Sequence, residues 1–102
     1  MARKIIWSKQ AQQDRYSIFK FWNKRNKSTR YSKKLNKLFI AAAEFVAQNP
    51  STGKLTDREN IRLKFVSHFA LIYEAKQSQL HLLSIFDTRQ NPDKLEEIIS
   101  NE

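Results

Sequence analysis

Residues 60–92 constrain the fold more than any other part of the chain. They contain three runs rich in leucine, β-branched and aromatic residues, at about 60–66, 69–75 and 79–86, with short polar breaks between them. Runs of this length and composition are typical of β-strands, and breaks this short join antiparallel neighbours. The sequence therefore predicts a three-stranded antiparallel meander here.

The first of these runs alternates between apolar and charged residues. Ile61, Leu63 and Phe65 are separated by Arg62 and Lys64. Successive side chains of a strand point to opposite faces, so we expect the apolar side chains to face a core covered by helices. The two cations would then share the uncovered face. The third run is apolar at nearly every position, which favours a central strand.

Two helices are predicted before the meander. A short apolar run over about 3–7 is interpreted as a first strand, and Ser8 as the N-cap of a helix that ends near Lys24. The polar, basic segment 23–28 interrupts the helical period and is predicted to connect this helix to a second one.

The second helix is predicted from about Thr29 to Gln48, where Asn49-Pro50 ends it. After the meander, Asn91-Pro92-Asp93 is a favourable start for a short last helix. The predicted fold is α+β, in the order β-α-α-β-β-β(-α). A mostly antiparallel, twisted sheet would carry the αα-hairpin on one face.

Length and composition indicate a single domain over residues 1–102. The chain has no cysteine, so neither a disulfide framework nor thiolate chemistry is available. No apolar run approaches the length of a membrane span, and no hydrophobic signal segment is evident. We expect a cytoplasmic protein that does not contact the membrane.

The charge of the chain is concentrated in its first half. The net charge is +9, but residues 1–54 hold thirteen basic and only two acidic side chains. Such a field attracts nucleic acid, the ribosome or an acidic protein. Four cations recur every three or four residues on the second predicted helix, and this stripe is either a binding surface for an anionic partner or a solvated face: Arg30, Lys33, Lys34 and Lys37.

Motifs for cofactor or metal chemistry are missing from the sequence. There is no glycine-rich phosphate loop, no His/Cys ligand pattern and no nucleophile motif. We therefore expect neither cofactor nor metal. His68, in the predicted turn between the first two strands of the meander, and His81 are the side chains whose ordinary pKa lies nearest neutrality.

The order of these segments resembles that of the RelE/ParE family of type II toxins. The segments that carry the resemblance span nearly the whole chain: IIWS at 5–8, RLK at 62–64, FALIYE at 69–74 and LLSIFDTRQNP at 82–92. The closing DTRQNP looks most like the ParE-like, plasmid-stabilisation branch. The order of all these parts carries the resemblance.

The resemblance also implies which residues a nuclease of this family would use. Members that cut mRNA on the ribosome carry two cations on the second strand, an arginine on the third, and an arginine and a tyrosine near the C-terminus. Here Arg62, Lys64 and Arg89 match, with His68 as a further candidate. The position of the third-strand arginine falls on Ala70, and no tyrosine follows Arg89.

These departures favour binding over cleavage. The leading hypothesis is a ParE-like toxin that inhibits growth by binding a large target, DNA gyrase, and that a cognate acidic antitoxin neutralises. The first alternative is a ribosome-dependent mRNA endonuclease of RelE type. Others are a non-catalytic, basic nucleic-acid-binding module and a scaffold that has lost activity. For target binding we expect Arg62, Lys64 and Arg89 to converge on the uncovered sheet face. The four helix cations are further candidates for binding the target or a polyanion.

Overall fold

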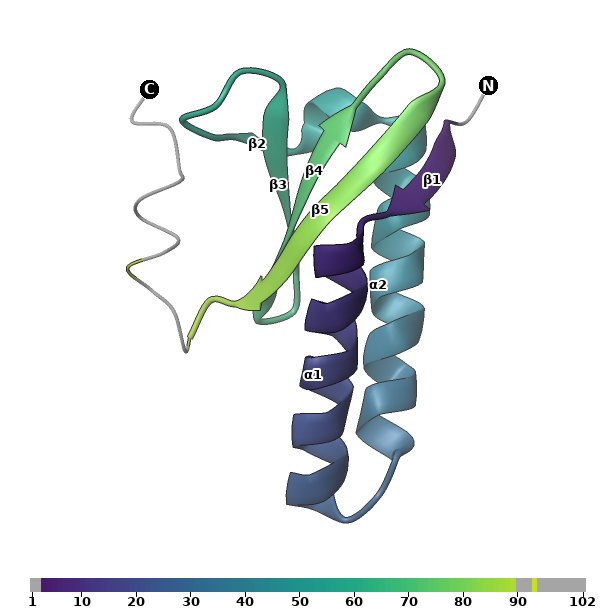
Figure 1. Cartoon of the computed structure of the whole chain (residues 1–102), viewed down its shortest axis with the longest axis vertical. Coiled ribbons are helices and arrows are strands. Elements are labelled where there is room, and N and C mark those ends of the chain that lie inside the picture. The colour runs from purple at the N-terminus through teal and green to yellow at the C-terminus, as the bar shows by residue number, and fades with distance from the viewer. Residues whose placement is uncertain (1–2, 90–92, 94–102) are drawn as a thin grey trace.

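The strands and helices predicted before residue 90 are present, with bounds within about two residues of those expected. The computed structural model describes residues 3–89 and 93 (Figure 1). Its elements are β1 (Lys4–Trp7), α1 (Lys9–Asn26), α2 (Arg30–Gln48), the 3-10 helix η1 (Pro50–Thr52), β2 (Lys54–Leu55), β3 (Ile61–Val66), β4 (Phe69–Ala75) and β5 (Gln79–Asp87). The short η1 and β2 were not predicted. The last helix predicted from residue 91 lies, apart from Asp93, outside the described residues.

The strands form one five-stranded sheet in the order β1-β5-β4-β3-β2. All neighbours are antiparallel except β1 and β5, which are parallel. The α+β class and the mostly antiparallel sheet are therefore confirmed. Strand β5 lies between β1 and β4 in the interior of the sheet, as its apolar sequence predicted.

Helix α1 begins where β1 stops and then closes the free edge of β5. The Ser8 hydroxyl accepts a hydrogen bond from the Ala11 amide at 3.0 Å, which confirms the predicted N-cap. One turn further on, the Asp14 carboxylate accepts hydrogen bonds from the Ser84 hydroxyl at 2.8 Å and the Ile85 amide at 3.0 Å. A carboxylate thus satisfies a backbone donor of β5 beyond the end of its pairing with β1.

Helix α2 packs behind the sheet in the view of Figure 1 and supplies much of the core. Its Leu35 and Phe39 are fully buried, and the Phe39 ring meets Phe69 of β4 edge to face at 5.4 Å between centroids. Leu80 and Leu82 of β5 complete this core. The apolar stripe predicted for the second helix therefore faces the sheet.

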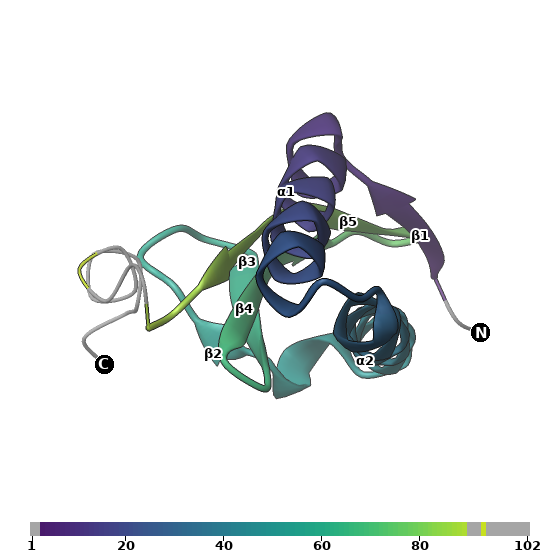
Figure 2. The ribbon, with the colours of Figure 1, turned by 90° about the horizontal axis from the view of Figure 1, so that it is seen from below.

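The two helices form a hairpin that extends beyond the sheet, so its closed end is far from every strand (Figure 1). Figure 2 shows the molecule from the side of this closed end. The turn closes at Lys27, whose backbone is left-handed with φ of 52° and whose amide donates to the Asn23 carbonyl. We call this closed end, residues 20–34, the hairpin tip.

A second, smaller apolar cluster lies on the face of the sheet turned away from α2, which we call the outer face. It consists of Leu63, Ala70 and Phe86, with Ile72 packed against it. Because strand residues alternate in direction, Arg62 and Lys64 of β3 point to the other face, where α2 lies. Their predicted place on the uncovered face is therefore wrong.

The prediction failed because apolar side chains lie against both faces of β3, in the main core on the α2 side and in the smaller cluster on the outer face. The alternation itself was predicted correctly, but the apolar residues of β3 contribute to the outer cluster. The main core on the α2 side is built by β4 and β5 instead. The long, flexible stems of two cations can be accommodated beside α2 with their charged heads near its edge.

Candidate functional site

The four cations predicted on α2 are all exposed and share the solvent side of the helix. Arg30, Lys33, Lys34 and Lys37 are exposed, whereas Leu35 and Phe39 on the opposite side are buried. Within the described part of the chain, the single ion pair joins Arg89 to Asp87, so none of the carboxylates described there pairs with these α2 cations. The surface that they form is strongly positive and available to an anionic partner.

Exposed apolar side chains continue this surface along α2. Leu38 is 38% exposed and Phe45 45% exposed. They are seven residues apart and therefore on the same side of the helix. The ammonium group of Lys64 on β3 lies 4.8 Å from the centroid of the Phe45 ring, a cation–π contact. This helix thus presents an apolar patch next to a cationic one, a combination that suits an amphipathic acidic segment.

Arg62, on the α2 side of β3, is held by hydrogen bonding to the backbone of the segment that joins α2 to β2. Its guanidinium donates to the Gly53 carbonyl at 2.8 Å. Opposite it on β4 is Tyr73, whose hydroxyl donates to the Pro50 carbonyl at 2.5 Å and accepts from the Gly53 amide at 3.1 Å. Burial raises the pKa of Tyr73, and the Gly53 hydrogen bond and the Arg62 charge oppose the rise. Arg62 and Tyr73 together fix the link from α2 to β2.

Arg89 and His68 lie at the far end of the sheet from Arg62. The Thr88 amide donates to the His68 carbonyl at 2.9 Å, which brings the exit of β5 against the β3–β4 turn. Arg89 is 54% exposed, and its Nε lies 3.8 Å from the Asp87 carboxylate. From Arg62 to the end of β3 at Val66 the strand rises about 13 Å. The predicted convergence of Arg62, Lys64 and Arg89 in one cluster is therefore wrong.

The place of the nuclease arginine is filled by a buried alanine. Ala70 is fully buried on the outer face, paired across the sheet with Phe65 on one side and Phe86 on the other. Leu63 packs in the same cluster. A cationic head at this position would have to displace apolar neighbours before it could reach a substrate.

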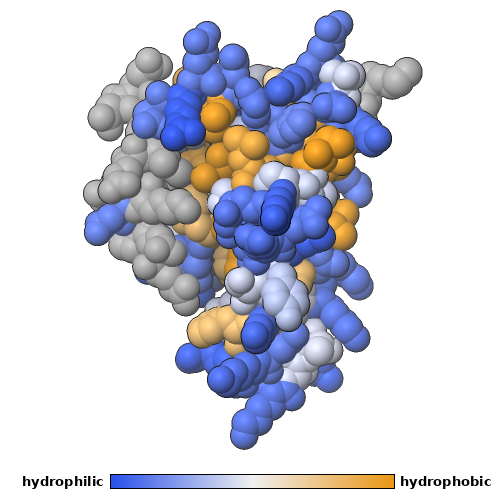
Figure 3. Space-filling model, viewed as in Figure 1, coloured by the Kyte–Doolittle hydropathy of each residue, from blue (hydrophilic) through white to orange (hydrophobic). Residues whose placement is uncertain are grey.

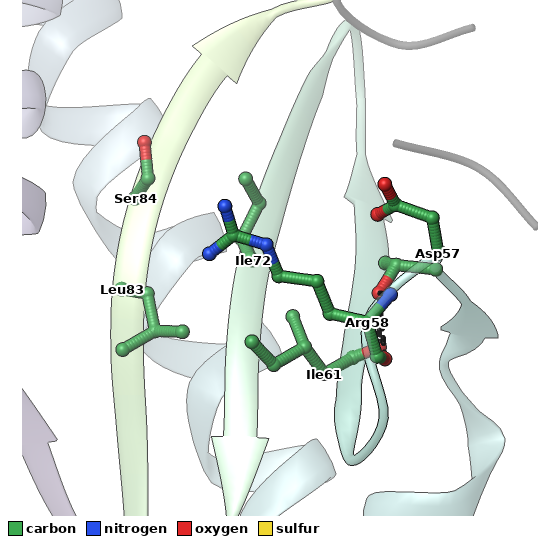
Figure 4. Close-up of a pocket in the computed structure, with 7 residues that line it drawn as sticks. Asp57, Arg58, Ile61, Ile72, Leu83 and Ser84 are labelled. Atoms are coloured by element: carbon green, nitrogen blue, oxygen red, sulfur yellow. Dashed lines mark hydrogen bonds between the residues drawn. The ribbon is translucent and has the colours of Figure 1, made fainter. Parts of the chain in front are cut away.

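The outer face also holds a hollow that the sequence did not predict (Figure 4). Its volume is about 410 Å³, and its floor is apolar, with Ile61, Ile72 and Leu83. Arg58, from the loop between β2 and β3, extends its guanidinium over this floor on the side of Ser84 (Figure 4). The hollow therefore combines an aliphatic floor with two side chains of opposite charge, Arg58 and Asp57.

The loop that carries Arg58 is held by one hydroxyl group. Thr56 is buried, and its hydroxyl donates to the Ile61 carbonyl at 2.7 Å and accepts from the Arg58 amide at 3.2 Å. Asn60 adopts a left-handed backbone with φ of 67°, which asparagine tolerates better than most residues. These hydrogen bonds and the left-handed turn lie within the loop itself. In the sequence, the one signal for them was Asn60 in a polar segment.

The described residues contain no set of metal ligands. Among them, no group of three or more His, Asp, Glu or Cys side chains is close enough to hold an ion. In the same part of the chain, no helix is long and apolar enough to cross a membrane.

The second histidine considered, His81, is engaged by its neighbour. Its Nε2 forms a hydrogen bond with the Gln79 side chain at 2.9 Å.

The comparisons with known proteins define the class of protein first. A family model described as "ParE toxin of type II toxin-antitoxin system, parDE" matches residues 5–92. The chain is thus a toxin of a type II toxin–antitoxin system, and its partner is an antitoxin. Within that class it belongs to the ParE toxin family.

A solved structure supports the fold independently of sequence similarity. A chain of the chromosomal ParDE toxin–antitoxin system from P. aeruginosa superposes with a TM-score of 0.71 at 13% identity. The match covers 84% of this chain and 96% of that chain. A search of curated proteins found no significant match.

Proposed function

We propose that this ParE-family toxin stops growth by binding DNA gyrase and not by cutting RNA. The observation that carries the proposal is the burial of Ala70, where nuclease relatives place an arginine. Removing one group that stabilises transition-state charge typically costs about a hundredfold or more in rate. The separation of Arg62 from Arg89 and His68 adds to this, because general acid–base catalysis requires its groups to surround one phosphate.

Supercoiling by purified gyrase tests the gyrase part of the proposal. Toxin added to gyrase, ATP and relaxed plasmid is expected to stop supercoiling and to leave cleaved plasmid joined to the enzyme. The matched control is the same toxin mixed beforehand with its antitoxin, which should restore supercoiling. Unchanged supercoiling at a tenfold molar excess of toxin over gyrase would contradict the proposal.

We further propose that an acidic, partly disordered segment of the antitoxin covers the solvent face of α2. The neighbouring cations Lys33 and Lys37 would pair with its carboxylates, and Leu38 and Phe45 would receive its apolar residues. A segment that folds on binding can cover a large surface with few residues. Co-expression of the antitoxin is expected to restore growth to cells that make the toxin, and the two proteins should purify together.

Charge reversal on α2 locates this contact. Lys33→Glu with Lys37→Glu is expected to weaken the antitoxin complex by about tenfold or more, because like charges would then face each other. Titration calorimetry measures the change. The control reverses the charge of the exposed Lys54 and Lys76, which lie outside α2. Equal weakening by both pairs would refute this location, and a toxin that is harmless when made alone would refute the toxin assignment itself.

A further inference from the structure

We propose that the hairpin tip binds the phosphate backbone of duplex DNA. This inference goes beyond the proposed function, because it concerns direct contact with nucleic acid whatever the protein target is. It rests on the charge, the position and the rigidity of the tip.

The tip lies in the segment of the sequence with the highest density of positive charge. Residues 15–43 contain nine Lys and Arg residues and no Asp or Glu. Asp14, just before this segment, is turned toward β5, where it accepts hydrogen bonds from Ser84 and Ile85. The tip contributes seven exposed cations, none of them in an ion pair among the described residues: Lys20, Lys24, Arg25, Lys27, Arg30, Lys33 and Lys34.

The tip is placed to reach a polyanion without obstruction from the sheet. It forms the far end of the molecule from the strands, and that end is mostly hydrophilic in Figure 3. Lys20 and Lys24 lie on one side of α1, about 6 Å apart along the axis. Across the turn, a hollow of about 320 Å³ is lined by Asn26, Ser28, Arg30, Tyr31 and Lys34. Hydroxyl, amide and cationic donors together are the groups that contact phosphate oxygens.

Aromatic contacts hold the two helix ends of the tip together. The Trp22 ring of α1 meets Tyr31 of α2 edge to face at 4.9 Å between centroids, and the Arg25 guanidinium lies 5.8 Å from the same Trp22 ring. The Ser32 hydroxyl donates to the Asn23 side chain at 2.6 Å. The cations therefore project from a braced scaffold, which lowers the entropy cost of binding.

The composition of the tip favours nucleic acid over a protein partner. Protein interfaces are depleted of charge at their centre, whereas interfaces with DNA are strongly positive. The exposed large apolar residues of α2 lie beyond the tip, at Leu38, Ile40 and Phe45. In the α1 part of the tip Phe21 is 44% exposed, and its ring packs edge to face on Trp22. A duplex is favoured over a single strand because single strands bind by stacking bases on free aromatic rings. Here Trp22 and Tyr31 are engaged with each other.

Fluorescence anisotropy with a labelled duplex of mixed sequence tests the proposal, with the full chain titrated at several salt concentrations between 50 and 200 mM. Binding is expected to weaken with salt, with a slope of log K of about −0.9 for each phosphate contacted. The variant Lys20→Gln/Lys24→Gln/Lys27→Gln is expected to lose about tenfold or more in affinity. Its slope should also become shallower by about 2–3, roughly one for each cation removed.

The matched control is Lys4→Gln/Lys54→Gln/Lys76→Gln, which removes the same charge from exposed lysines outside the tip. It should bind within about twofold of the parent protein, and circular dichroism should show both variants folded. Equal weakening of the two variants would overturn the proposal, since only overall charge would then matter. Binding of polyglutamate without binding of the duplex, or much tighter binding of an RNA hairpin, would overturn it as well. None of these lysines belongs to the α2 surface proposed for the antitoxin, so each proposal can fail alone.

Discussion

Replacement of Gly53 by alanine is expected to lower the free energy of unfolding by about 2–4 kcal/mol, a sum of overpacking and of disrupted buried hydrogen bonds. A Cβ atom at this position would lie 2.1 Å from the Tyr73 hydroxyl oxygen and 2.8 Å from the Leu63 carbonyl oxygen. The backbone at Gly53 is extended, with φ of −72° and ψ of 159°, so any residue can adopt it. The whole cost comes from lack of space.

Tyr73 cannot relieve this clash by moving aside. Its side chain is only 1% exposed, and its hydroxyl holds both the Pro50 carbonyl and the Gly53 amide. Displacing it would leave buried polar groups without partners. The substitution should therefore loosen the link between α2 and β2, which carries the loop with Arg58.

Urea denaturation of Gly53→Ala, Tyr73→Phe and the double variant measures the effect. Removal of the hydroxyl should relieve part of the clash, so alanine should cost less in the Tyr73→Phe background than in the parent. Ser51→Ala, at a neighbouring exposed position, should change stability by less than about 0.5 kcal/mol. If alanine at position 53 costs the same in both backgrounds, the two residues are not coupled and the explanation is wrong.

Ala70→Arg is expected to destabilise the toxin by at least about 3 kcal/mol, because the larger side chain overpacks the outer cluster and buries a charge. Leu63 and Phe86 occupy the surrounding space, and no part of Ala70 is exposed. The control is Phe65→Arg, since Phe65 faces Ala70 across the sheet but is 44% exposed. That arginine can place its head in water, so it should cost about 1 kcal/mol or less.

Thermal and urea unfolding distinguish the two arginine variants. The expected result means that the nuclease arginine cannot simply be added to this sheet. An Ala70→Arg protein as stable as its parent would show that the site has room for a cation. The argument from the burial of Ala70 against RNA cleavage would then fail.

The sequence was sufficient to predict the main elements of the fold. Residue composition and the alternation of apolar and polar residues located β3, β4 and β5. Ser8 and Pro50 correctly marked the start of α1 and the end of α2. These are local signals, read from adjacent residues. Alternation in β3 also placed Arg62 and Lys64 on the same face.

The sequence was insufficient wherever the answer depended on long-range packing. The alternation of apolar and charged residues in β3 does not indicate which face of the strand a helix covers, because apolar side chains can pack into a core on either face of the sheet. Edge protection of β5 by Asp14 joins residues about seventy positions apart, and nothing near Asp14 indicates it. The hollow under Arg58 likewise needs β3, β4, β5 and the loop to be in place.

The candidate site was predicted in part. The exposure of the α2 cations was expected from their period, and the structure places all four on the solvent side. The cations at the end of α1 were missed, although a signal was available in the absence of acidic residues between Asp14 and Glu44. The proposed trio of Arg62, Lys64 and Arg89 failed, because residues that align with a catalytic set need not meet in space.

The most direct test of the central claim compares two products in the same cells after toxin induction. One assay measures gyrase covalently joined to DNA, and the other maps the 5′ ends of mRNA on translating ribosomes. Binding of gyrase without RNA cleavage predicts that covalent gyrase–DNA complexes accumulate while codon-positioned mRNA ends stay at the level of uninduced cells. Codon-positioned cuts that Arg89→Ala abolishes, with gyrase complexes unchanged, would contradict the claim and identify an endonuclease.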